Sequence, residues 1–108
     1  MPDDGEFEEL QLALEIDRVI HEPARLLILA VLSKVDWADF KFLLAATSLS
    51  KGNLSKQSTK LEEAGYIHIE KYFKGKVPAT RYRITEQGTT ALAEYWKHLT
   101  NLQDSLRD

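Results

Sequence analysis

The sequence predicts a mainly α-helical domain that carries a small β-hairpin. Three observations support this fold class. Apolar residues recur at helical spacing in several separate segments, an alternating pattern occurs between residues 66 and 84, and a row of large apolar residues runs along the C-terminal segment. The chain has 108 residues, of which 44% are hydrophobic and 29% are charged, so we expect one domain that spans 1–108.

The N-terminal segment 6–20 is predicted to form an amphipathic helix, because Phe7, Leu10 and Leu14 follow one another at steps of three and four residues. Pro23 interrupts it, since a proline nitrogen has no hydrogen to donate inside a helix. The same residue suits the first turn of a second helix, which we expect over 23–35. This helix is apolar on nearly all sides and is therefore expected at the centre of the domain.

Residues 39–64 are predicted to form a helix-turn-helix. Asp39 is a suitable N-cap for a short helix that ends near Ala46, and a tight turn follows. Ser50 is a suitable N-cap for the next helix, which is expected to end at Ala64. Gly65 then supplies the left-handed residue that often ends a helix.

A β-hairpin is predicted over 66–84. Ile67 and Ile69 alternate with polar residues, and the same period of two returns at Tyr82 and Ile84. The segment KGKVPA at 74–79 lies between them and contains Gly75 and Pro78, which are typical of turns. The tip of this hairpin is expected to be basic.

The last helix is predicted over 85–105, with Thr85 as its N-cap. Its apolar residues follow the spacing of a coiled-coil seam. They are Leu92, Tyr95, Leu99, Leu102 and Leu106. We expect the helices 6–20 and 85–105 to form a homodimer interface; the alternative is that the stripe packs on its own domain.

The charges are segregated along the chain. The total is −3, but residues 1–22 carry a net charge of −7 and residues 50–83 a net charge of +5. Three helices followed by a hairpin is the order of a winged helix, in which the third helix enters the major groove of DNA and the hairpin contacts the flanking backbone. The positive charge falls on these two elements, so the sequence predicts binding to double-stranded DNA.

The candidate DNA-binding residues are cations and hydrogen-bonding groups outside the expected core. They are Ser50, Lys51, Gly52, Asn53, Ser55, Lys56, Gln57, Thr59 and Lys60 on the third helix, with Lys74, Lys76 and Arg81 on the hairpin. The first turn of the third helix also offers free backbone N–H groups to a phosphate. Arg81 is expected either at the backbone or in a narrow minor groove. The alternative for these lysines is an ordinary solvated surface.

The chain resembles the winged-helix regulators related to the MarR and ArsR groups. The matching stretches are IDRVIHEPARLLILAVLSKV at 16–35, ADFKFLLAATSLSKGNLSKQSTKLEEAGYIHIEK at 38–71 and GKVPATRYRITEQGTTALAEY at 75–95. The resemblance implies a dimeric, repressor-like regulator. Ser48 stands where the family usually has glycine, which predicts some strain in a left-handed position. The thiol ligands of the metal-sensing relatives are absent, so metal sensing by that route is not expected.

Other classes of function find little support in the sequence. There is no cysteine, the three histidines match no ligand spacing, and no nucleophile motif or phosphate-binding loop is present, so we expect neither a metal, a cofactor nor an enzymatic activity. A membrane span and a secretory signal are not expected either, which favours a cytoplasmic location. A small-molecule effector is left open. The alternative function is a winged-helix protein-interaction module without DNA binding.

Overall fold

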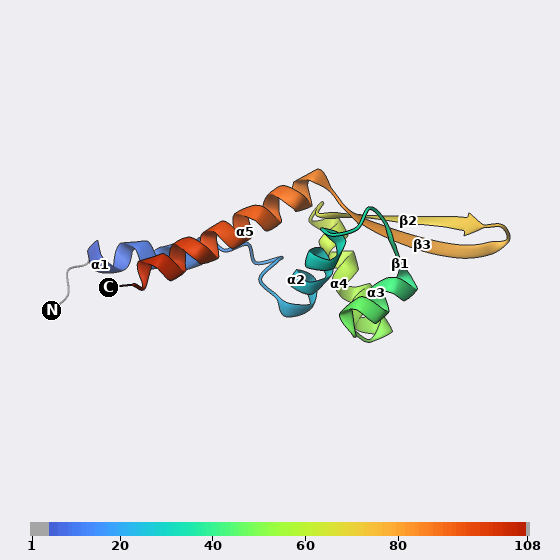
Figure 1. The fold of residues 1–108 in the computed structure, drawn as a ribbon, viewed down its shortest axis with the longest axis horizontal. Helices are drawn as coiled ribbons and strands as arrows, with labels where there is room; N and C mark the ends of the chain where they lie inside the picture. The colour runs from blue at the N-terminus through green and yellow to red at the C-terminus, as the bar shows by residue number, and fades with distance from the viewer. Residues whose placement is uncertain (1–4, 108) are drawn as a thin grey trace.

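The computed structural model describes residues 5–107 and confirms a mainly helical fold with a small antiparallel sheet. The molecule is elongated, with extents of 69 × 25 × 21 Å. The helices α2 (Pro23–Leu32), α3 (Phe40–Thr47) and α4 (Lys51–Glu63) lie with the hairpin at one end. The helix α1 (Gly5–Glu8) and the far part of α5 (Glu86–Ser105) project together from the other (Figure 1). Asp3 and Asp4 of the acidic N-terminal segment lie outside the described residues.

The N-terminal helix is shorter than predicted. It consists of α1 (Gly5–Glu8) and a 3₁₀ helix, η1 (Glu9–Glu15), instead of one helix over 6–20. The reason lies at Asp17, whose Oδ1 accepts hydrogen bonds from the backbone N–H groups of Val19 at 2.8 Å and Ile20 at 3.1 Å. An aspartate side chain that accepts from backbone N–H groups two and three residues later stabilises a turn in place of the helix.

The central helix α2 (Pro23–Leu32) begins at the predicted proline but ends three residues earlier than expected. Its last turn tightens into bonds of i→i−3 type, from Lys34 N to Val31 O and from Val35 N to Leu32 O. Ile28, Leu29 and Leu32 are fully buried, as expected for the centre of the domain, whereas Leu27 is exposed.

The helix-turn-helix follows the predicted caps. Asp39 accepts from Phe42 N at the start of α3 (Phe40–Thr47), and Ser50 accepts from Asn53 N at the start of α4 (Lys51–Glu63). Ser48 between them has a φ of 57°, which confirms the expected left-handed position. Gly65 ends α4 with a φ of 82°.

The sheet contains a strand that the sequence analysis missed. Short β1 (Ala38–Asp39) pairs with β3 (Val77–Ile84), which pairs in turn with β2 (Ile67–Lys74), so the strand order is β1-β3-β2. The hairpin strands are also longer than predicted. Lys74 pairs with Val77, which leaves a turn of two residues, Gly75 and Lys76, instead of a loop over 74–79. A two-residue turn needs a positive φ, and Gly75 has 67°.

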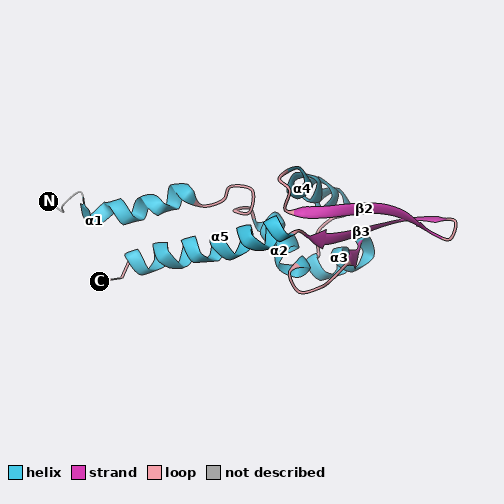
Figure 2. Ribbon diagram, turned by 90° about the horizontal axis from the view of Figure 1, so that it is seen from above, coloured by secondary structure: helices cyan, strands magenta, loops and turns pink. Residues whose placement is uncertain are grey.

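The terminal helix α5 (Glu86–Ser105) begins at the predicted cap, with Thr85 accepting from Gly88 N. Leu92 and Tyr95 are buried in the core of their own domain, Leu99 packs beside them, and Leu106 is 67% exposed. Beyond the core, α5 lies alongside α1 and η1, as two perpendicular views agree (Figures 1 and 2). The apolar row that runs from Leu92 to Leu106 therefore starts in the core and ends exposed to solvent.

Tyr66 ties the segment before the hairpin to the N-terminal turn, because its hydroxyl donates a hydrogen bond to Asp17 Oδ2. Burial and the neighbouring Asp17 carboxylate raise the pKa of Tyr66 to about 12. Below pH 10 the hydroxyl is protonated in both the folded and the unfolded chain. Above pH 10 the unfolded chain loses this proton first, so the stabilisation by Tyr66 is lost as the pH rises from 10 through 12.

We therefore expect the free energy of unfolding, measured in urea, to fall more steeply between pH 9 and pH 11.5 for the wild type than for Tyr66→Phe. The phenylalanine variant keeps the ring but has no proton to lose. Parallel declines in the two proteins would show that Tyr66 does not contribute to the alkaline transition.

Candidate nucleic-acid interface

The N-terminal turn of α4 presents its backbone to open space. Ser50 Oγ accepts from Asn53 N at 3.1 Å, which leaves the N–H groups of Lys51 and Gly52 at the positive end of the helix dipole. A Cβ added at Gly52 would meet no atom within 4 Å. Internal packing therefore does not require glycine at this position, and an external group can approach the backbone closely.

The outer side of α4 carries most of the predicted contacts. Leu54, Ser58 and Leu61 form its inner side and are almost completely buried. The exposed residues are Ser50, Lys51, Gly52, Ser55, Lys56, Thr59 and Lys60, and Asn53 is half-buried. Lys51, Lys56 and Lys60 take part in no ion pair within residues 5–107. Their charges are thus available to a polyanion.

Gln57 is placed differently from the other predicted contacts. Its side chain is only 8% exposed, and both ends of its amide are occupied. Oε1 accepts from Arg25 of α2 at 2.7 Å, and Nε2 donates to Asn53 Oδ1 at 3.0 Å. The expectation that Gln57 contacts DNA directly is therefore not supported by its position, because the partners of this amide lie inside the protein.

A cleft separates α4 from the hairpin. It has a volume of about 380 Å³, and Ser55 and Thr59 of α4 line it together with Lys71 and Thr80 of the hairpin. Lys71 and Thr80 are cross-strand partners and so share one face of the sheet. The outer side of α4 and this face of the hairpin therefore border the same hollow, in which Lys71 is the cation among the lining residues.

Ser58 lies at the bottom of this cleft and is 1% exposed. Its Oγ is a buried polar atom without a hydrogen-bond partner in the described part of the chain. Thr59, the next residue, instead bonds the carbonyl oxygen four residues earlier in the usual manner of a helical hydroxyl.

The tip of the hairpin extends well beyond the helices (Figure 1). Lys74 and Lys76 are exposed there, as predicted for a basic tip. Phe73 and Val77 flank them and are 71% and 64% exposed. The tip therefore combines exposed cations with apolar surface.

Arg81 is not free in the way that the tip lysines are. Its guanidinium donates to Glu70 Oε1 at 2.9 and 3.2 Å, and it stacks over the ring of Trp37 at 3.9 Å. Arg81 and Glu70 are cross-strand partners on the sheet face opposite to that of Lys71 and Thr80. Arg81 thus lies on the side of the hairpin away from the cleft. Lys74 pairs with Val77 and falls on the same face as Arg81, so Lys71 is the hairpin cation that lines the cleft.

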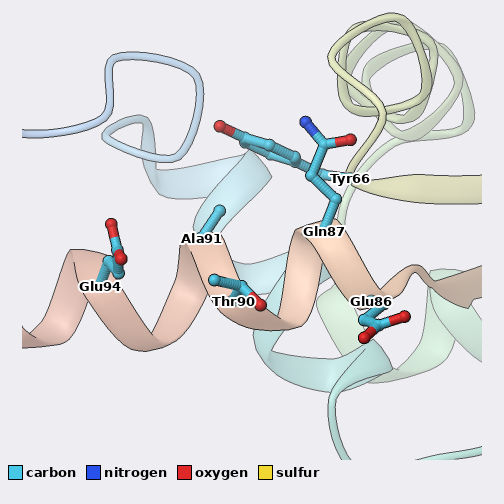
Figure 3. A pocket seen from close by; sticks show the side chains of 6 residues that line it. All are labelled: Tyr66, Glu86, Gln87, Thr90, Ala91 and Glu94. Atoms are coloured by element: carbon cyan, nitrogen blue, oxygen red, sulfur yellow. The ribbon is translucent and has the colours of Figure 1, made fainter.

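A second hollow of about 470 Å³ lies beside the first turns of α5. Figure 3 shows the Tyr66 ring over Ala91 and beside Gln87. Glu86, Thr90 and Glu94 complete its lining. The two carboxylates make this hollow unfavourable for a nucleic-acid phosphate.

Three further observations concern the described residues. Within residues 5–107, no group of three or more histidine, aspartate or glutamate side chains is arranged to hold a metal ion. None of the helices in that range combines the length and hydropathy that a bilayer crossing requires. His21, one of the three histidines, pairs through Nδ1 with the Tyr95 hydroxyl at 3.0 Å.

Arg25 and Trp37 were not predicted from the sequence as parts of this region. Arg25 and Trp37 act through partners that are distant in the sequence, so no local pattern could indicate them. Lys71 follows Ile67 and Ile69 at a period of two and shares their face.

Comparisons with known proteins agree with this geometry. The model of the winged helix DNA-binding domain family matches residues 24–103. An uncharacterised protein of Methanocaldococcus jannaschii is 30% identical over 90 residues, which cover 82% of this chain and 97% of that protein.

Two solved structures show the same fold. A transcriptional regulator homologue from Pyrococcus horikoshii OT3 superposes with a TM-score of 0.80 and 26% identity, over 94% of this chain and 99% of its own. A MarR family transcriptional regulator from Silicibacter pomeroyi has a TM-score of 0.63 and 20% identity, over 89% of this chain and 64% of its own.

Proposed function

The chain belongs to the winged helix DNA-binding domain family, and on this premise we propose that it is a repressor-like transcriptional regulator that binds specific duplex sequences as a homodimer. The solved structures that it resembles are those of transcriptional regulators, which are not enzymes. The observation that carries the proposal is the basic, hydrogen-bonding surface of α4, which borders one cleft with the hairpin.

In the proposed complex α4 enters the major groove and the hairpin tip reaches the adjacent backbone. The proposed contacts are Ser50, Lys51, Gly52, Asn53, Ser55, Lys56, Thr59, Lys60, Lys74 and Lys76. Cations supply the affinity through phosphates, and the polar side chains of α4 supply the selection of bases. The two α4 helices of a dimer would lie about 34 Å apart, one helical turn of DNA.

The proposed dimer interface is the projecting arm formed by α1, η1 and the far part of α5. Phe7, Leu14 and Leu106 on this arm are between 50% and 74% exposed, although they are large and apolar. A second copy of the chain would cover them, because its arm exposes the same three apolar residues and a twofold axis brings like surfaces together. The acidic elements α1 and η1 then lie at the end away from DNA (Figure 1).

The interface predicts an effect of one charge on the mass in solution. Leu14 is 74% exposed in the single chain, so Leu14→Asp removes little packing from the fold but places a carboxylate inside the dimer interface. We expect light scattering at micromolar concentration to give about twice 12.3 kDa for the wild type and 12.3 kDa for the variant.

Phe73→Asp is the matched control, because Phe73 is similarly exposed but lies near the hairpin tip at the other end of the molecule. It should remain a dimer. A monomeric wild type, or loss of the dimer in the control alone, would contradict the proposed interface.

Fluorescence anisotropy with a random-sequence duplex tests the proposed function. We expect binding that weakens steeply as salt increases, with a slope of log K against log[salt] of about −0.9 for each phosphate contact. A chain that binds no duplex even at about 50 mM salt, where phosphate contacts are strong, would instead favour a protein-interaction module.

A further inference from the structure

Three side chains form a hydrogen-bonded series that runs from α2 to the outer side of α4. The series begins at Arg25, whose side chain is 13% exposed and is anchored by donation from Nε to Val19 O and from Nη2 to Arg18 O. Arg25 Nη1 donates to Gln57 Oε1 at 2.7 Å. Gln57 Nε2 then donates to Asn53 Oδ1 at 3.0 Å.

The direction of this series is fixed by chemistry. An arginine has N–H donors and no acceptor, so the Gln57 atom that faces Arg25 has to be the oxygen. The NH₂ group of Gln57 must then face Asn53, and Asn53 must turn its oxygen toward Gln57. Reversing either amide would bring two N–H groups together and leave a donor of the buried Gln57 unpaired.

As a result, Asn53 presents its NH₂ group outward. This Nδ2 group makes no hydrogen bond within residues 5–107, and it is not among the buried polar atoms that lack a partner there, so it is open to solvent. Asn53 lies in the first turn of α4, the part of such a helix that reaches base edges. The end of the side chain that can meet DNA is therefore a donor.

We propose that Arg25 and Gln57 are positioning residues that hold Asn53 as a hydrogen-bond donor, so that Asn53 selects guanine over adenine in the bound duplex. An unconstrained asparagine recognises adenine with one acceptor and one donor, toward N6 and N7. Here the oxygen is turned inward and only N–H groups are offered. Guanine presents two acceptors, N7 and O6, side by side in the major groove and fits this arrangement.

The inference rests on the proposed function, and its test separates the two. Duplexes selected by the wild type from a random library are varied at each position, and the guanine-to-adenine affinity ratio is measured. At one position of each half-site this ratio should be about 10 for the wild type, within the range of a good base contact. Gln57→Met keeps the length of the side chain but breaks the series, so the ratio should fall toward 1 at that position while the salt slope stays unchanged.

Two further variants complete the design. Asn53→Asp offers only acceptors and should shift the preference at the same position toward cytosine, which presents an N4 donor. Glu63→Gln is the matched control, because Glu63 is exposed on α4 but lies outside both the series and the proposed DNA contacts. It should leave the ratio at the Asn53 position unchanged.

Side-chain amide exchange, measured by NMR on the free protein, tests the series without DNA. Slow exchange of the Gln57 amide protons and fast exchange of the Asn53 amide protons are expected; the reverse order would overturn the assigned orientation. If the wild type binds duplexes selectively and Gln57→Met keeps the same ratio, the inference fails while the proposed function stands. If the wild type binds no duplex, the proposed function fails, and base selection by Asn53 fails with it.

Discussion

Replacing Gly88 by alanine is expected to destabilise the protein by at least about 3 kcal/mol, which corresponds to a fall in Tm of more than about 10 °C. Gly88 lies in the first turn of α5 where it crosses the start of the hairpin. A Cβ there would lie 2.0 Å from Tyr66 O and 2.9 Å from Tyr66 C. These atoms cannot move aside easily, because Tyr66 O also accepts a hydrogen bond from Thr85 N at 3.0 Å.

Gly52→Ala is the matched control for this prediction. It is also a glycine in the first turn of a helix, but an added Cβ would meet nothing within 4 Å. We expect its Tm to stay the same or to rise slightly, because alanine restricts the unfolded chain. A Gly88→Ala protein as stable as Gly52→Ala, measured by thermal unfolding, would contradict the close contact between α5 and Tyr66.

The second large effect concerns the lysines of α4. Replacing Lys51, Lys56 and Lys60 together by glutamine is expected to weaken duplex binding by roughly two orders of magnitude at 0.1 M salt and to flatten the salt slope by about 2.7 for each protomer. The reason is counterion release, since each lost phosphate contact removes about 0.9 from that slope. All three side chains are exposed, so the fold should persist.

Lys97 and Arg107 serve as the control, because they are also exposed but lie on and just after α5, outside α4 and the hairpin. Changing both to glutamine should leave the slope nearly unchanged. Equal losses of duplex affinity per removed charge in the two variants would mean that the net charge of the protein, and not the α4 surface, governs binding.

The helix boundaries that could be predicted are those set by local chemistry. Asp39, Ser50 and Thr85 bond the N–H group three residues later, and Gly65 adopts a left-handed φ, each as its residue type favours. These interactions involve neighbours in the sequence, so the sequence contains the information for them.

The boundaries that were missed depend on distant partners or on a competing local bond. Ala38 is a strand residue only because Tyr82 pairs with it, and two residues are too few for a period to appear. The first helix ends before Asp17 because the Asp17 carboxylate accepts hydrogen bonds from the backbone N–H groups of Val19 and Ile20. The apolar spacing of 6–20 gives no sign of these bonds. In both cases tertiary pairing or side-chain capping overrides the periodic pattern.

The same distinction holds for the candidate site. Exposure of Lys51, Lys56 and Lys60 followed from the spacing of the buried residues between them. The positions of Gln57 and Arg81 did not, because Arg25 lies 32 residues before Gln57 and Trp37 lies far from Arg81 in the sequence. A polar residue on the exposed side of a pattern is thus a candidate contact only until its long-range partners are known.

Amide hydrogen exchange with and without a bound duplex tests most directly the claim that one end of the molecule binds DNA. We expect slowing of exchange on DNA binding to be concentrated in α4 and in the hairpin tip around residues 73–77, while α1, η1 and the far part of α5 are unaffected. Slowing confined to the terminal helices, with α4 unchanged, would contradict it.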